Sequence, residues 1–140
     1  MTPRERERFD RLLEEILAAI PPALHELLEE APVLVDDRPS RALLRELGID
    51  AEQETLCGLH SGTPLTERSF QQGFDMPETI HLFREGIIEQ AGGWDERFDE
   101  EGAPMGGEAA VREEIRITLL HEIGHHFGLD EDDLARLGYE

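Results

Sequence analysis

The chain has 140 residues, with 33 acidic and 13 basic side chains, and its formal net charge is −20. This balance argues against nucleic-acid binding, because phosphate backbones are held by clustered Lys and Arg, and against docking on anionic lipid. No apolar run reaches the roughly 18 residues of a membrane-spanning helix, and the charged N-terminus lacks the apolar segment of a secretory signal. The single cysteine, Cys57, excludes an internal disulfide and is typical of a cytoplasmic protein. The length predicts one domain over residues 1–140.

Two helices are predicted at the N-terminus. A Thr-Pro start at residues 2–3 and apolar residues at helical spacing as far as Ile20 predict the first helix. Pro21 ends this helix and Pro22 can begin another. The two segments predict a helix pair over residues 3–31.

Short strands are predicted in the middle of the chain. An apolar run at residues 33–35 is bounded by proline and aspartate, which is typical of a buried strand. A short helix is expected over 41–47. Residues 55–60 (TLCGLH) and 79–83 (TIHLF) predict two further strands, the latter with alternating faces.

The C-terminal third changes from loop to helix. Residues 86–91 are expected to form a helical turn, and residues 92–107 hold five glycines and many acids, which predicts a long polar loop. From 108 to 127 the pattern is helical and apolar over more than half of the surface, which indicates a buried helix. Gly128 is expected to end it, and a short acidic helix over 130–137 follows.

The buried helix carries the segment HEIGH. His121 and His125 are four residues apart, so both imidazoles project from one helical face and can reach one ion. Glu122 lies at the edge of this face, where it can take a proton from a water bound to the ion. Buried polar groups need compensation, which a divalent cation supplies. We therefore predict His121 and His125 as metal ligands and Glu122 as the catalytic base.

A third ligand is expected just after the helix. Glu131 keeps the spacing of the longer HExxHxxGxxH metzincin signature, with Glu in place of its third His. A carboxylate is an acceptable ligand beside two histidines. Glu131 is therefore the predicted third ligand, and Asp130 and Asp132 remain alternatives.

Three neighbouring residues are candidates for supporting roles. Thr118, one turn before the motif, can orient a ligand or Glu122. Tyr139 is a candidate donor to a substrate carbonyl. His126 points about 100° away from the histidine pair and is expected to pack or to support a ligand.

The segment HEIGHHFGLDEDDLARLGY at 121–139 resembles the C-terminal signature of the small bacterial zincin-like proteins, which are also described as minimal metalloproteases. GTPLTERS at 62–69 and PETIHLFREGI at 77–87 resemble the same family more weakly. The resemblance implies an α+β fold, in which a small mixed three-stranded sheet packs with about five helices, including the buried active-site helix. It also implies Zn²⁺ at the two histidines of the motif and a following acid, with the motif glutamate as base.

Four functions follow from these observations. The first is a zinc-dependent peptidase whose peptide or protein substrate pairs with an exposed edge strand, for which residues 79–84 are the candidate. The second is a catalytically silent metal-binding module, because none of the nine residues after Glu131 is the Met of a metzincin turn. The third is a deformylase-like hydrolase with Cys57 as a ligand. The fourth is a protein-interaction domain whose acidic surface meets a basic partner.

Overall fold

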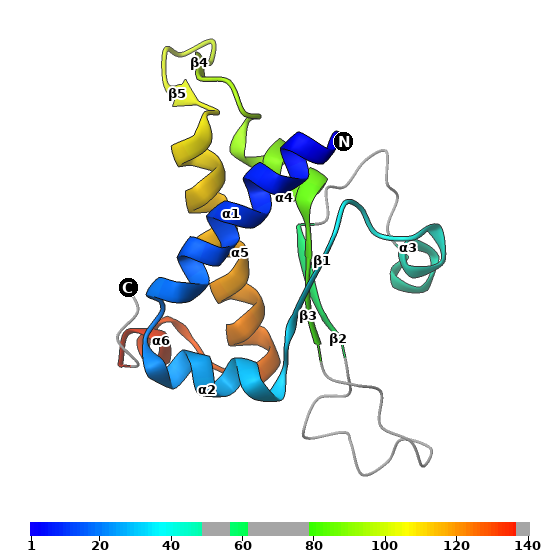
Figure 1. Cartoon of the computed structure of the whole chain (residues 1–140), viewed down its shortest axis with the longest axis vertical. Helices are drawn as coiled ribbons and strands as arrows, with labels where there is room; N and C mark the ends of the chain where they lie inside the picture. Colours follow the sequence, from blue (N-terminus) through cyan, green and yellow to red (C-terminus); the bar gives the residue numbers. More distant parts are fainter. Residues whose placement is uncertain (49–56, 62–78, 137–140) are drawn as a thin grey trace.

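The computed structural model describes residues 1–48, 57–61 and 79–136. Figure 1 shows the helices and strands in chain order: α1 (Pro3–Ala19), α2 (Pro22–Glu30), β1 (Val33–Asp36), α3 (Arg41–Leu47), β2 (Gly58–Ser61), β3 (Thr79–Phe83), α4 (Arg84–Ala91), β4 (Arg97–Phe98), β5 (Pro104–Met105), α5 (Glu108–Phe127) and α6 (Glu131–Arg136). The predicted helix pair and the long C-terminal helix are confirmed. The resemblance at 62–69 lies outside the described residues.

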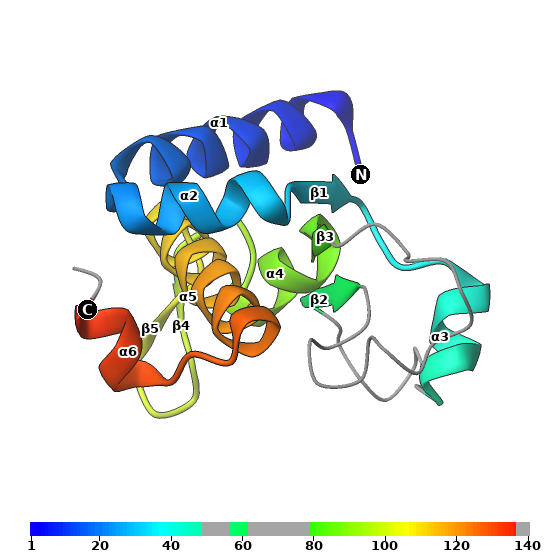
Figure 2. The same ribbon diagram turned by 90° about the horizontal axis from the view of Figure 1, so that it is seen from below.

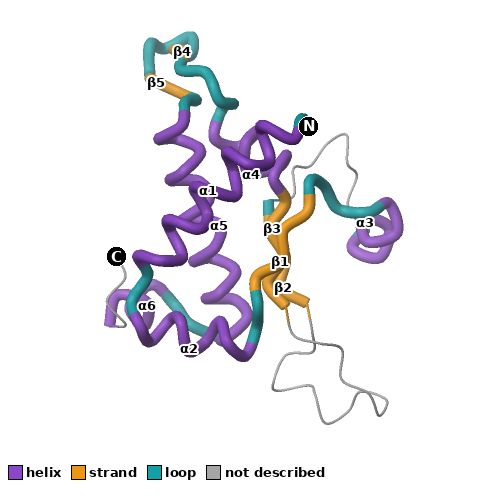
Figure 3. Tube along the Cα trace, in the orientation of Figure 1, coloured by secondary structure: helices purple, strands orange, loops and turns teal. Residues whose placement is uncertain are grey.

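Three strands form a mixed sheet in the order β1-β3-β2. β1 runs parallel to β3, with Val33 opposite Ile80, and β2 runs antiparallel to β3, with Gly58 opposite Leu82. The predicted mixed three-stranded sheet is therefore confirmed. β4 and β5 form a separate two-stranded hairpin within the expected loop over 92–107, and Figure 3 shows this hairpin apart from the sheet.

The expectation that residues 79–84 form an exposed edge strand is wrong. β3 is the central strand and has a hydrogen-bonded neighbour on each side. The alternation that predicted this strand reports which of its side chains are buried, and Ile80 and Leu82 are indeed buried completely. The alternation does not indicate how many neighbouring strands pair with β3. The edge strand that packs against α5 is β2.

The hydrophobic core gathers around α5. This helix packs against α1, α4, β2 and β3, and Figure 2 shows α1 on one side of it and α4 and the sheet beside it. Fully buried side chains come from α1, α4, α5 and the sheet, among them Phe9, Leu82, Ile87, Ile115, Leu119 and Ile123. None of the described helices has the length and hydropathy needed to cross a membrane.

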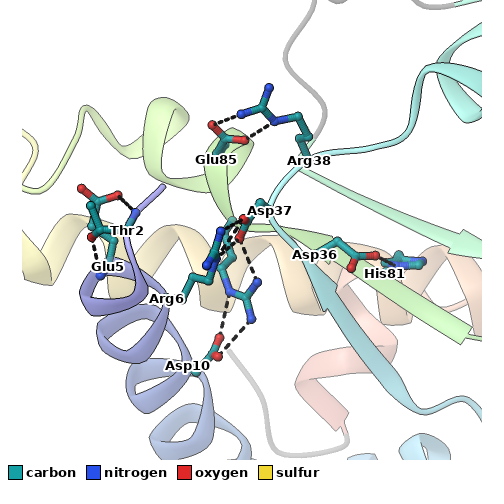
Figure 4. A network of polar contacts seen from close by, with 10 residues as sticks. Thr2, Glu5, Arg6, Asp10, Asp36, Asp37, Arg38, His81 and Glu85 are labelled. Carbon is teal, nitrogen blue, oxygen red and sulfur yellow. Dashed lines mark hydrogen bonds and ion pairs between the residues drawn. The ribbon is translucent and has the colours of Figure 1, made fainter.

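Local signals set the ends of the helices that frame the core. The Thr2 hydroxyl accepts from the Glu5 backbone N–H, and the Glu5 carboxylate accepts from the Thr2 N–H, which is a capping box (Figure 4). At the other end of the chain, Gly128 has a φ of 68°, and the left-handed conformation stops α5 after Phe127.

An ionic network ties α1 and α4 to the segment after β1 (Figure 4). The Arg84 side chain is only 13% exposed, and its guanidinium donates to Asp10 at 3.0 Å and to Asp37 at 3.0 Å. Arg6 donates to Asp37 at 2.7 Å. Hydrogen bonds from Arg6, and then from Arg84, hold the pKa of Asp37 below its ordinary value.

Arg84→Met is expected to lower the free energy of unfolding by about 2 kcal/mol. The change removes a cationic partner from the half-exposed carboxylate of Asp10 and from the largely buried carboxylate of Asp37. Arg38→Met is the matched control, since Arg38 pairs with Glu85 but is 73% exposed, and its loss should stay within about 0.5 kcal/mol. Urea unfolding of the two variants measures the difference. Equal losses would contradict a structural role for the Arg84 network.

Candidate metal centre

α5 has one buried side and one exposed stripe. Ile115, Leu119 and Ile123 are completely buried, whereas Ile117 is 45% exposed. His121 and His125 continue the exposed stripe at intervals of four residues. The expectation that the two histidines are buried is therefore wrong. The prediction overestimated how much of α5 is buried, because it treated the apolar residue Ile117 as part of the core.

The two imidazoles lie side by side on this stripe. Their ring centroids are 4.2 Å apart, and the ring planes are tilted by 48°. Residues one turn apart on a helix face are neighbours, so the spacing alone predicted this contact. Two neutral imidazoles so close together offer a pair of nitrogen donors to one ion, and their exposure leaves room for the ion and for further ligands.

Glu122 lies on the buried side of α5, next to the exposed stripe, and is 9% exposed. Strand β2 lies directly against it: a Cβ at Gly58 would be 3.0 Å from Glu122 Cγ and 3.0 Å from Thr118 Cγ2. Only glycine allows the strand to approach so closely without displacing these side chains. Gly58 thus helps to set the position of Glu122.

A cleft of about 260 Å³ opens between the β2 end of the sheet, α4 and α5. It brings both His121 and Glu122 to one solvent-accessible hollow. Thr118 lies in the same cleft, as expected for a residue that orients Glu122. The lining residues are Cys57, Gly58, Gln90, Glu114, Ile117, Thr118, His121 and Glu122.

A model of the zincin-like metallopeptidase family matches residues 28–139, which include this cleft and the whole histidine motif. The chain belongs to the zincin-like metallopeptidase family. The match confirms the resemblance inferred from the sequence, and the observed α+β fold agrees with it. A comparison with curated proteins gives no match.

The segment that carries the predicted third ligand of this zincin-like chain turns back immediately after the motif. The Leu129 N–H donates to the Gly124 carbonyl at 2.7 Å. A Cβ at residue 124 would lie 2.9 Å from the Leu129 carbonyl oxygen, so glycine is needed for this close return. The turn leads directly into α6, where Glu131 is the first residue and is exposed.

The structure brings His121 and His125 together but does not gather Glu131 with them. Among residues 1–48, 57–61 and 79–136, no three His, Cys, Asp or Glu side chains form a metal-ligand group. Asp130 has a different role. Its N–H donates to Asp133 at 3.0 Å and its carboxylate accepts from the Asp133 N–H at 2.8 Å, which caps α6. The ligand role of Glu131 stays a prediction, and Asp132 remains an alternative.

Cys57 lies in the cleft, just before β2. Burial, followed by the carboxylates of Glu114, Glu89 and Glu122, raises the pKa of the Cys57 thiol to about 11. The thiol is therefore neutral at pH 7 and is a poor nucleophile in this environment.

Sequence reasoning missed two residues of this site. Gly58 had a usable signal, because an isolated glycine inside a strand pattern indicates a close backbone approach. Glu114 had none, because a single carboxylate in an acidic helix is most often solvated. Tyr139 lies outside the described residues.

Proposed function

We propose that this zincin-like metallopeptidase hydrolyses peptide bonds, with Zn²⁺ held by His121, His125 and Glu131 and with Glu122 as the general base. One observation carries the proposal: His121, whose imidazole lies against that of His125, and the buried Glu122 line one cleft beside an edge strand. The family match supports the metallopeptidase class.

The donor set fits zinc. Two imidazole nitrogens and one carboxylate oxygen are a known ligand set of catalytic zinc sites, which keep a fourth position for water or substrate. When bound, the ion lowers the pKa of a water molecule and polarises the scissile carbonyl. The exposed pair of histidines leaves that fourth position accessible to a substrate.

Glu122 moves the protons of the reaction. Its carboxylate accepts a proton from the attacking water as the water oxygen bonds to the carbonyl carbon. It then passes this proton to the amide nitrogen as the C–N bond breaks, which releases an amine and a carboxylic acid. The contact with Gly58 restrains the side chain, so that its carboxylate stays near the cleft.

The substrate backbone is proposed to pair with β2. In the described sheet, β2 has β3 on one side only, and β2 packs against α5. An extended peptide added to this edge gains main-chain hydrogen bonds and runs beside the cleft. This open cleft favours catalysis over a silent metal-binding module, whose metal would be closed by a fourth protein ligand.

Incubating the zinc-loaded protein with a peptide library, followed by mass spectrometry of the products, tests the proposal. We expect new amino and carboxyl termini that depend on zinc. A fully zinc-loaded protein that cleaves no member of the library would contradict peptidase activity.

Gly58→Ala is expected to lower kcat/KM about 10- to 100-fold, because the added methyl group displaces Glu122 and small misplacements of reacting groups are costly. The zinc content should not change, since the atoms nearest to a Cβ at Gly58 belong to Glu122, Thr118 and His81 and not to the proposed ligands. Leu34→Ala, on the opposite edge strand, is the control and should retain the parent rate. Unchanged cleavage by Gly58→Ala would exclude this positioning role.

Glu131→Gln is expected to weaken zinc binding about 10- to 100-fold, because a neutral amide is a poor substitute for a carboxylate ligand. Asp132→Asn, a neutralisation at the next residue, serves as the comparison. Competition with a zinc chelator gives both affinities. A larger loss in Asp132→Asn than in Glu131→Gln would transfer the ligand role to Asp132.

A further inference from the structure

Glu114 is the one carboxylate in the cleft that the proposed hydrolysis does not use. It lies on α5, seven residues before His121, which is about 10 Å along the helix axis. It lines the same hollow as His121 and Glu122. We propose that Glu114 selects peptides that carry an arginine or lysine side chain next to the scissile bond, an inference that rests on the peptidase function proposed above.

The carboxylate of Glu114 is available to a ligand. The charged residues near Glu114 on α5 are engaged elsewhere: Arg112 pairs with Glu15, and Glu113 accepts from Arg116 at 2.6 Å. Within the part of the chain that the structure describes, the Glu114 carboxylate makes no hydrogen bond or ion pair. Its exposed fraction is intermediate, so it is partly desolvated while it faces the cleft.

At the Glu114 end of the cleft, about 10 Å along the helix from His121 and the proposed zinc ion, the charge favours a cation. The described lining of the cleft includes two carboxylates, Glu114 and Glu122, and no arginine. Burial and the neighbouring Glu113 raise the pKa of Glu114, so a positive group beside it would relieve an unfavourable charge. Burial is the main cause of the raised pKa of Cys57 at the other wall, and the negative charges of Glu114, Glu89 and Glu122 add to it.

The shape of the lining suits a long amphipathic side chain. Ile117 lies between Glu114 and His121 on α5, and its side chain is 45% exposed at the cleft. A lysine or arginine stem can pack on this apolar surface while its charged end reaches Glu114. An aliphatic residue would leave the carboxylate without a partner, and an acidic residue would be repelled by it.

The test compares three peptides that differ only at one position beside the cleavage site, where they carry Arg, Ala or Glu. For the zinc-loaded parent we expect kcat/KM at least about tenfold higher for the Arg peptide than for the Ala peptide, as for one charge-assisted contact. In Glu114→Gln this ratio should fall close to one. In Glu114→Lys the preference should shift to the Glu peptide, a result that a merely structural role of Glu114 would not produce.

Glu113→Gln is the matched control. It removes the adjacent carboxylate, which is paired with Arg116 on the exposed side and is absent from the cleft lining. It should keep the Arg preference of the parent. A parent without a basic preference, or a Glu114→Gln variant that retains one, would overturn the proposal.

A binding measurement tests the Glu114 subsite independently of the proposed hydrolysis. Fluorescence anisotropy with the zinc-loaded Glu122→Gln variant measures Kd for labelled Arg and Ala peptides without cleavage. A Glu114-dependent Arg preference in binding, together with no cleavage by the parent, would support the selective subsite and contradict hydrolysis. Cleavage without that preference would support hydrolysis and overturn the subsite.

Discussion

Glu122→Gln is expected to reduce peptide cleavage by about 10²- to 10⁴-fold and to leave the zinc content of the protein unchanged. The amide keeps the shape of the side chain against Gly58, but it cannot accept a proton from the attacking water. Because Glu122 is the proposed base and not a ligand, catalysis and metal binding should separate in this variant.

Single-turnover cleavage and zinc analysis on the same preparation measure both properties of Glu122→Gln. Glu113→Gln, an equal change on the exposed side of α5, is the control and should cleave as the parent does. Cleavage by Glu122→Gln at the parent rate would exclude Glu122 as the base. Loss of zinc in this variant would instead indicate that Glu122 is a ligand.

His125→Ala is expected to lose most of the bound zinc and, with it, all zinc-dependent cleavage. Removing one imidazole of the pair leaves His121 as the only proposed histidine ligand, which is too few for a stable zinc site. The exposure of His125 means that its removal costs the hydrophobic core little. The loss should therefore be specific to the metal.

Zinc per chain after gel filtration in metal-free buffer measures the effect of His125→Ala. His25→Ala is the control, because His25 is exposed on α2, outside the motif. It should retain the zinc content of the parent. Undiminished zinc in His125→Ala would place the metal elsewhere, and circular dichroism would confirm that both variants keep their helices.

Local sequence signals predicted much of the fold. The ends of α1, α2 and α5 were predictable because each depends on a residue at or beside that end: Thr2, Pro22 and Gly128. The pairing of His121 with His125 was predictable for the same reason, since helix geometry alone brings residues four apart together.

Tertiary relationships were not predictable in this way. The order of the strands depends on pairing between distant segments, so β3 was wrongly expected at the edge of the sheet. The exposure of Ile117 and of the two histidines depends on which neighbours cover α5. Gly58 and Glu114 acquire their significance only because β2 and α4 meet α5 at the cleft.

The central claim is that the paired imidazoles of α5 hold the zinc ion at which peptide bonds are cleaved. Anomalous diffraction from crystals of the zinc-loaded protein tests this claim most directly. We predict a single zinc peak about 2.0–2.1 Å from a ring nitrogen of His121 and of His125, with one carboxylate and one solvent molecule completing the coordination. A peak away from these two rings, or a zinc ion closed by four protein ligands, would contradict it.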